Sequence, residues 1–278
     1  MAETASVPTN DLAIKEATSN TDRFYTQVKS LHNFDDMEVQ CVIKNLLSKT
    51  QEEGCHLATY IRTRSNVDTL LLLQEPKHFQ AIAMVARALF ELSVEAMFLE
   101  TIPNAWIKIT HHADVEKLRL ANKIIEFKKE NACVATDTTI YQNYIDRESS
   151  RITAVQNSLW PGVKKVAHWS GMNLAQRCAS LKTPFDQIYN DDYPRVSWYA
   201  HPGLAGIAHI QFVTFIHVCG HAFNLAVKSY EQSLRSAIRV FKLTRGNDRS
   251  IDRLEAALRF PFADTDEQVE ALRKRAGL

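Results

Sequence analysis

The segment FQAIAMVARALFELSVEAMFLE, residues 79–100, decides the fold that we predict for this chain. The preceding segment, Gln74-Glu75-Pro76, predicts an interruption of helical structure just before residue 79. The apolar residues of the segment 79–100 recur every three or four positions and cover nearly all sides of a helix, and a helix that is apolar all round is normally buried. We therefore expect residues 79–100 to form a helix near the centre of the protein. The apolar positions are Ala81, Ile82, Val85, Leu89, Leu92, Ala96 and Leu99.

The composition predicts an all-α protein with the architecture of a helical bundle. Only 8 of the 278 residues are glycine and 8 are proline, and alternating Val, Ile and Thr runs are few, which leaves little material for sheets and their turns. A chain of this length can bury a sizeable core. Further helices are expected at 11–31, from Asp35 or Asp36 towards Arg64, from Pro103 to Lys129, from Thr136 or Asp137 to Leu159, from Pro202 towards Lys242, at 251–259 and at 266–274, with short helices at most between Trp160 and Gly203.

The chain shows no clear linker. No tract rich in Gly, Pro or Ser divides it, and no internal repeat is present. We therefore expect one main helical domain at residues 35–245, with an N-terminal arm and helix at 1–34 and C-terminal helices at 246–278 packed on the same domain.

Charge and cysteine content narrow the class of protein. The chain has 33 basic and 32 acidic residues, so no global positive field recruits nucleic acid, and any contact with RNA must be local. Five cysteines without CxxC spacing argue against a disulfide framework and a zinc ribbon. The N-terminal residues lack the pattern of a signal peptide, and the apolar run Leu204–Val227 carries polar groups that are costly in a bilayer. We expect a cytoplasmic protein without a membrane span, a metal or a cofactor.

The segment DDYPRVSWYAHPG, residues 191–203, concentrates residue types that do chemistry. Pro202 suits the first turn of a helix, which would put His201 at a helix N-terminus, where amide donors favour an anion. Arg195 can offer a bidentate fork to a phosphate, and a histidine can exchange protons near neutral pH. The two together would suit metal-independent cleavage of RNA. The alternative is that Arg195 pairs with an aspartate of the same segment and that His201 only caps the helix.

A charged stripe crosses the apolar helix at residues 79–100. Arg87, Glu91 and Glu95 follow one another at intervals of four residues, so they share one helix face. If the stripe is exposed to solvent, it is a solvated helix face with a weak ion pair. Inside the protein, it would be a network that lines a cleft or orients a catalytic loop.

Two further groups of residues have a structural and a functional interpretation. Trp169 either plugs a packing gap or, with His168, forms a wall of the same pocket as the Arg195 segment. His217 and His221 share a helix face and could share a metal ion, but no acidic third ligand lies nearby in the sequence. We therefore expect these two histidines to lie in the core or at an interface.

The order of these motifs resembles a bacterial family of helical proteins catalogued only as a domain of unknown function. More distantly, the arginine and histidine of residues 195–201, with five residues between them, resemble the signature of the HEPN superfamily, helical bundles named for higher eukaryotes and prokaryotes nucleotide-binding. Many HEPN members are ribonucleases, toxins or antiviral effectors that pair two such motifs across a dimer. The first resemblance covers roughly residues 35–235 and rests on Arg87 with Glu91, His168-Trp169-Ser170-Gly171, Tyr193, Ser197 and His201-Pro202.

The resemblance implies that Arg195 and His201 form a catalytic pair. Val196 stands where catalytic members usually carry a polar residue, and Ser197 could supply that group one position later. We expect a HEPN-like, metal-independent endoribonuclease that acts on RNA as a homodimer, in the manner of a toxin or an antiviral or stress-defence effector. The alternative is a non-catalytic helical module that binds a partner protein or senses a ligand. The supporting site residues would be Arg87, Glu91, Tyr193, Ser197, His168 and Trp169.

Overall fold

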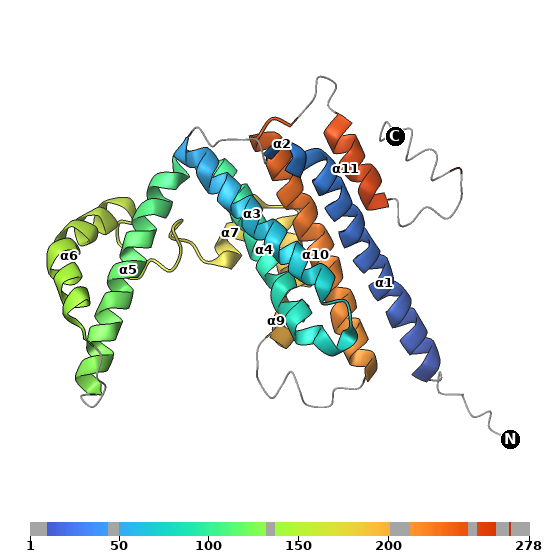
Figure 1. Ribbon diagram of the computed structural model, residues 1–278, viewed down its shortest axis with the longest axis horizontal. Coiled ribbons are helices and arrows are strands. Elements are labelled where there is room, and N and C mark those ends of the chain that lie inside the picture. Colours follow the sequence, from blue (N-terminus) through green and yellow to red (C-terminus); the bar gives the residue numbers. More distant parts are fainter. Residues whose placement is uncertain are drawn as a thin grey trace. The chain divides into compact units, whose positions relative to one another are not determined.

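The computed structural model describes residues 10–43, 50–131, 137–200, 212–243, 249–259 and residue 267. All regular structure in these residues is helical, as the composition predicts, and they include no strand. The elements are α1 (Asn10–Phe34), the π-helical η1 (Asp35–Gln40), α2 (Cys41–Ile43), α3 (Gln51–Leu72), the 3-10 helix η2 (Pro76–His78), α4 (Phe79–Thr101), α5 (Ala105–Glu130), α6 (Thr139–Leu159), α7 (Leu174–Leu181), α8 (Phe185–Asp191), α9 (Tyr193–Ala200), α10 (Phe212–Val240) and α11 (Arg249–Arg259) (Figure 1).

Contacts divide the chain into two compact units. The first unit comprises the residues up to Thr101 and from Cys178 onward, and the second unit comprises Ile102–Arg177. The domain boundaries at residues 35 and 245 stay a prediction.

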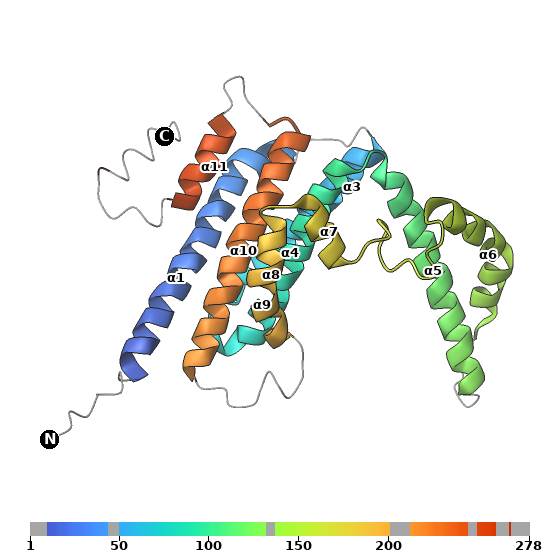
Figure 2. The ribbon, with the colours of Figure 1, turned by 180° about the vertical axis from the view of Figure 1, so that it is seen from behind.

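Helices α4 and α10 form the centre of the first unit. α10 lies between α1 and α4, while α3 and α9 pack on α4 (Figures 1 and 2). The expected central helix at residues 79–100 is confirmed, because Ile82, Leu89 and Phe90 of α4 are fully shielded from solvent. Burying a side chain of this size contributes about 1.5–3 kcal/mol. α4 therefore supplies a large share of the free energy that burial of apolar side chains contributes to the stability of the first unit.

Helix α1 is fixed at two points. The Thr21 hydroxyl donates to the Ile216 carbonyl of α10 at 3.0 Å, and a Cβ added at Gly220 would lie only 3.0 Å from the same Thr21 oxygen. Glycine thus permits the close approach of α1 and α10. Further along α1, Gln27 and Ser30 donate to carbonyl oxygens in the last turn of α11, at 2.9 and 2.8 Å, and so satisfy acceptors that a helix end leaves open.

The helix expected from Asp35 or Asp36 towards Arg64 is wrong at its start. The chain passes from α1 through η1 into α2 as continuous helical backbone, so neither aspartate begins a new helix. α3 begins instead after Thr50, whose hydroxyl accepts from the Glu53 amide at 3.1 Å while the Glu53 carboxylate accepts from the Thr50 amide at 3.2 Å. This reciprocal capping box defines the start of α3.

The other expected helices differ from the structure by a few residues. α1, α5, α6 and α11 correspond to the segments predicted near 11–31, 103–129, 137–159 and 251–259, and α7, α8 and α9 are the short helices predicted before Gly203. α10 occupies most of the segment predicted from Pro202 towards Lys242, but residues 201–211 lie outside the described part. The helix predicted at 266–274 also lies outside it, apart from residue 267.

The second unit contains the pair of helices α5 and α6, which pack against each other. The N-cap of α6 is Thr138, so the helix starts slightly later than the predicted cap at Thr136 or Asp137. Asp137 lies just before the N-cap and accepts a hydrogen bond from the Thr139 amide at 2.9 Å. Ala121 of α5 and Ile152 of α6 are buried, whereas most other residues of the two helices keep some solvent exposure.

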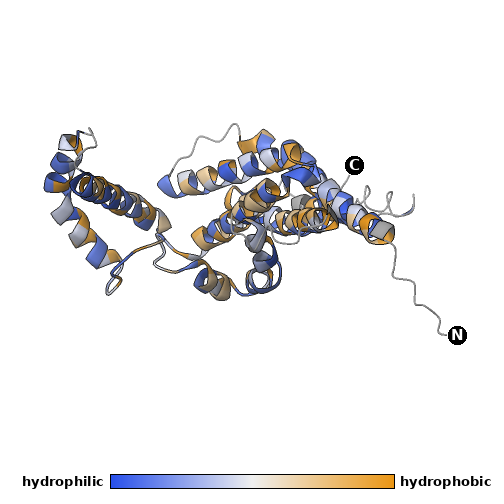
Figure 3. Ribbon diagram, turned by 90° about the horizontal axis from the view of Figure 1, so that it is seen from below, coloured by the Kyte–Doolittle hydropathy of each residue, from blue (hydrophilic) through white to orange (hydrophobic). Residues whose placement is uncertain are grey.

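Polar and apolar residues share the same helices throughout the described chain, as the hydropathy colouring shows (Figure 3). Among the described residues, no helix combines the length and apolar character that crossing a membrane requires.

Candidate functional site

Helix α9, which carries Arg195, is anchored to α4 through Tyr193. The Tyr193 hydroxyl donates to Glu91 at 2.9 Å, and Arg87 donates to the same carboxylate oxygen at 3.0 Å. The Arg87 guanidinium also lies over the Tyr193 ring, 5.5 Å from its centre. Arg87 and Glu91 thus join a network between two helices, with side chains that are 31% and 43% exposed. The pair is neither fully buried nor an isolated surface ion pair, and a role of the stripe in lining a cleft or orienting a catalytic loop stays a prediction. Burial and the negative charge of Glu91 raise the pKa of Tyr193 to about 12, so Tyr193 stays a donor at neutral pH.

The residue just before α9 ties it to α10. Asp192 accepts from Lys228 at 2.6 Å and from Asn224 at 3.2 Å. Both oxygens of the Asp192 carboxylate therefore accept hydrogen bonds from side chains of α10. Arg195 has no carboxylate within 4.0 Å among the residues that the structure describes, so the expected alternative of an ion pair with an aspartate of its own segment is not formed there.

Arg195 faces an open groove between α9 and α10. The groove has a volume of about 460 Å³. It brings the guanidinium of Arg195 together with two imidazoles and a largely exposed indole, that of Trp198, which is 60% exposed. We call it the Arg195 groove; its lining is Pro194, Arg195, Trp198, Tyr199, Thr214, His217, Val218 and His221.

The electrostatics of the Arg195 groove favour a neutral histidine beside a cation. Partial burial of the His221 ring and the positive charges of Arg195 and His217 lower the pKa of His221, while Asp192 acts in the opposite direction. The ordinary pKa of histidine is about 6.5, so a lowered pKa leaves the imidazole neutral at pH 7 and able to accept a proton. His217 and His221 are exposed residues of α10, so the expected position in the core is wrong, while the alternative position at an interface stays a prediction.

The helical geometry of α9 explains why Val196 is not polar. Tyr193 and Val196 lie three residues apart, share the inward face of α9 and are buried. Arg195 stands on the outward face beside the groove, and Ser197 is half-buried. Val196 therefore serves packing, and no polar group can be supplied from its position.

The predicted partner of Arg195, His201, lies outside the described residues. His217 and His221 are more than 20 residues further along the chain than Arg195, so nothing in the sequence assigns the three residues to one site. The spacing of four residues between the two histidines on one helix face was visible, but only the packing of α9 on α10 places them beside Arg195.

His168 and Trp169 belong to the second unit and form a compact turn there. The Trp160 indole donates to the Trp169 carbonyl at 2.7 Å, and Trp169 is only 4% exposed. Gly171 adopts a positive φ of 77°, and a Cβ added to it would lie 3.1 Å from the Trp160 ring. His168 and Ser170 contact each other at 2.8 Å. These contacts match the packing interpretation of Trp169, within the second unit.

A polar cluster that the sequence analysis missed lies in the core of the first unit. Asp35 is fully buried, and its carboxylate accepts from Tyr60 at 2.5 Å, from Arg64 at 2.8 Å and from the Tyr230 hydroxyl. Burial and the Asp35 charge raise the pKa of both tyrosines. Only tertiary structure could reveal this cluster, because Tyr230 is 195 residues from Asp35 in the chain.

The Asp35 cluster extends to the surface through Arg64. Its guanidinium also donates to Asp36 at 2.8 Å and to Asp68 at 3.1 Å, and His32 lies 2.8 Å from the same Asp68 oxygen. The side chains of Asp36 and Asp68 are 51% and 52% exposed, whereas that of Arg64 is 12% exposed. Asp35, Tyr60, Arg64 and Tyr230 thus form the inner part of the cluster, in which each donor has its acceptor.

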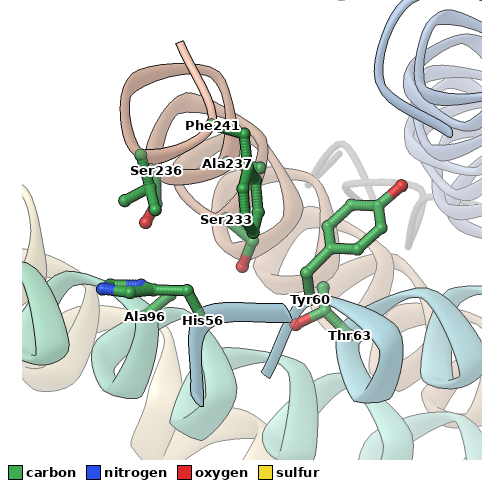
Figure 4. Close-up of a pocket in the computed structure, with 9 residues that line it drawn as sticks. His56, Tyr60, Thr63, Ala96, Ser233, Ser236, Ala237 and Phe241 are labelled. Atoms are coloured by element: carbon green, nitrogen blue, oxygen red, sulfur yellow. The ribbon is translucent and has the colours of Figure 1, made fainter. Parts of the chain in front are cut away.

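A small cavity lies close to the cluster, between α3, α4 and α10 (Figure 4). Its volume is about 10 Å³, room for about one water molecule, so it is too small for a substrate. His56 lines it, and burial lowers the pKa of that imidazole. We regard this cavity as part of the packed core.

The comparisons with known proteins identify a family but no function. The model of a family described as "Family of unknown function (DUF5677)" matches residues 55–214, from α3 to the start of α10. Neither the curated proteins nor the solved structures include a match. The matched region includes Arg87, Glu91, Tyr193 and Arg195 and covers more than half of the chain. The chain therefore belongs to DUF5677, a protein family of unknown function.

Proposed function

We propose that this protein is a HEPN-like, metal-independent endoribonuclease whose active site is the Arg195 groove. The observation that carries the proposal is the state of Arg195: its guanidinium has no carboxylate partner among the described residues and shares an open groove with His217 and His221. An unpaired guanidinium is well suited to a phosphate, which it can bind in a bidentate manner. Two imidazoles beside it supply the groups that general acid–base chemistry needs.

The proposed reaction needs no group beyond the protein and the RNA. The neutral imidazole of His221 removes the proton of a ribose 2′-hydroxyl, and that oxygen attacks the adjacent phosphorus. The bond from phosphorus to the 5′-oxygen breaks, and a protonated histidine, His217 or His201, gives the leaving oxygen its proton. The products are a 2′,3′-cyclic phosphate and a 5′-hydroxyl. Arg195 stabilises the negative charge that grows on the phosphate oxygens.

The surroundings of Arg195 support this role. Tyr193 and Asp192 link α9 to α4 and α10, so the helix that presents Arg195 is held from two sides. Trp198 exposes its indole beside the phosphate-binding position, and nucleobases stack on aromatic rings of this kind. A rigid helix and a stacking surface would fix the RNA strand against the groove.

RNA cleavage by the purified full-length protein in the presence of a chelator tests the proposal. We expect Arg195→Ala and His221→Ala each to slow cleavage by about 10²-fold or more, and His201→Ala to do the same if it supplies the second proton. Arg62→Ala is the matched control, because Arg62 is an exposed arginine of α3 outside the groove. The proposal fails if the wild-type protein leaves RNA intact, or if an Arg195→Ala, His201→Ala double variant cleaves as fast as the wild type.

The resemblance to HEPN proteins adds a homodimer and a role as a toxin or an antiviral or stress-defence effector to this proposal. Sedimentation of the purified protein tests the dimer. The defence role is tested by inducing expression in a bacterial host: growth should stop with the wild type and continue with Arg195→Ala. Equal growth of the two cultures would contradict that role.

One observation favours a second candidate, a non-catalytic module that senses an anionic ligand or binds a partner protein. Val196 is buried, so α9 lacks the polar residue that catalytic HEPN members usually carry after the arginine. In this function Arg195 binds an anion without any reaction. An oligonucleotide that binds in an Arg195-dependent manner and remains intact after prolonged incubation would favour the module over the nuclease.

A further inference from the structure

A second groove, on the helix pair α5 and α6, combines lysines with two aromatic side chains, the exposed Phe127 and the half-buried Tyr141. It lies wholly within the second unit and has a volume of about 340 Å³. We propose that this groove, the Lys123 groove, binds single-stranded nucleic acid. Because none of its residues belongs to the Arg195 groove, the inference does not depend on the proposed ribonuclease activity. Its lining is Lys123, Ile124, Phe127 and Lys128 of α5 and Tyr141 of α6.

Within the part of the chain that the structure describes, no carboxylate neutralises the lysines of the groove. Neither Lys123 nor Lys128 has a carboxylate within 4.0 Å among the described residues, and the nearby Glu126 and Glu130 do not line the groove. Elsewhere in the second unit the carboxylates are engaged, as with Glu148, which pairs with two arginines. Residues 102–177 carry 11 basic and 7 acidic residues, whereas the whole chain is near neutral. The groove thus offers a polyanion two lysines that no carboxylate of the described chain neutralises.

The aromatic side chains distinguish a nucleic acid from other polyanions. Phe127 is 55% exposed although it is a large apolar side chain, and it follows Lys123 by four residues, so the two lie on one face of α5. Tyr141 of α6, which is half-buried, also lines the groove. Single-stranded nucleic acid is bound by this combination, in which lysines contact the phosphates and aromatic rings stack on the bases. An acidic peptide would use the lysines but has no flat bases for the rings.

Binding of a labelled 2′-O-methyl oligouridine to the full-length protein, followed by fluorescence anisotropy, tests the inference. This probe lacks the free 2′-hydroxyl, so cleavage cannot interfere. We expect Phe127→Ala to weaken binding about tenfold, the middle of the range for loss of one stacked base. Lys123→Gln with Lys128→Gln should reduce the slope of log K against log salt by about 1.4, which corresponds to two phosphate contacts with a single strand.

The matched controls are substitutions of the same kind at positions outside the groove. Leu120→Ala removes another exposed apolar side chain of α5, and Lys164→Gln with Lys165→Gln removes two exposed lysines of the same unit outside the groove. Both should bind nearly as the wild type does. Circular dichroism of each variant confirms that the helices persist.

Three outcomes would overturn the inference. They are the absence of oligonucleotide binding, wild-type affinity in a folded Phe127→Ala variant, and equal or tighter binding of polyglutamate or of anionic vesicles through the same residues. Repeating the Phe127→Ala comparison in an Arg195→Ala background measures this groove apart from the Arg195 groove. Loss of cleavage with retained, Phe127-dependent binding, or the converse, would show which of the two proposals had failed.

Discussion

The Asp35 cluster and the Arg195 groove both contain an arginine, yet their surroundings are opposite. Arg64 is nearly buried and contacts three carboxylates, those of Asp35, Asp36 and Asp68. Arg195 is exposed and has no carboxylate within 4.0 Å among the described residues. The first arginine is fully engaged in holding helices together, whereas the second remains available to a ligand.

Burial accounts for the difference. A charge taken out of water must be paired and hydrogen-bonded, since leaving it without partners costs several kcal/mol. Asp35 therefore has three donors, from α3 and α10. Arg195 lines an open groove, where water can solvate its charge, so it needs no carboxylate partner from the described residues. Pairing thus indicates a structural role for Arg64, and its absence supports a binding role for Arg195.

The largest effect is expected at the buried end of the comparison, for Asp35→Asn. The substitution removes the negative charge that pairs with Arg64. It also places an amide NH2 group, which is a donor, where the carboxylate accepted hydrogen bonds from two tyrosine hydroxyls. The free energy of unfolding should therefore fall by about 3–5 kcal/mol. Urea denaturation measures it. Asp36→Asn, which changes an exposed neighbour in the same cluster, should cost less than about 1 kcal/mol. Equal costs for the two variants would show that the burial of Asp35 does not matter.

Alkaline pH should weaken the Asp35 cluster specifically. The pKa values of Tyr60 and Tyr230 are raised in the folded protein, whereas in the unfolded chain they are about 10. Their contribution is therefore complete below pH 10 and is lost as the pH rises above it, by up to about 1.4 kcal/mol per pH unit for each tyrosine. Urea denaturation between pH 9 and 11 should show a shallower decline in Tyr230→Phe than in the wild type. Identical slopes would contradict the role of Tyr230.

A smaller effect is expected where α9 joins the core, for Tyr193→Phe. Loss of the hydroxyl removes one hydrogen bond to Glu91 and should lower the free energy of unfolding by about 1 kcal/mol. Tyr189→Phe is the matched control, because Tyr189 stacks on Tyr193 at 5.4 Å and its hydroxyl has no hydrogen bond to a described residue. Chemical denaturation of both variants decides; a control as destabilised as Tyr193→Phe would argue against the bond to Glu91.

The smallest effect on stability is expected at the exposed end, for Arg195→Ala. The free energy of unfolding should change by no more than about 0.5 kcal/mol, as for other surface substitutions. Removing the positive charge should raise the pKa of His221, which Arg195 helps to lower. An NMR titration of the His221 ring measures that shift, and Arg62→Ala should leave it unchanged. A large loss of stability would place Arg195 with Arg64 among the structural arginines.

Local patterns predicted the helices well, and failed where distant residues decide. The apolar repeat of residues 79–100 predicted the central α4, because a helix with apolar side chains on nearly all sides is buried, and that distribution can be read from its own sequence. The pair Asp35 and Asp36 was wrongly assigned to a helix start, since a capping aspartate and a buried one look alike in sequence. The bonds from Tyr60 and Tyr230 that distinguish them come from other helices.

The candidate site shows the same division. The all-helical class, the central helix and Arg195 as a candidate could be predicted from the sequence, because they follow from side-chain type and from spacing along one segment. The contacts of the site depend on how the helices pack: Asp192 pairs with Lys228, Arg195 has no such pair in the described chain, and His217 and His221 share its groove. Such partners are chosen by the packing of α9 on α10, and contacts between segments far apart in a chain leave no periodic signal in either one.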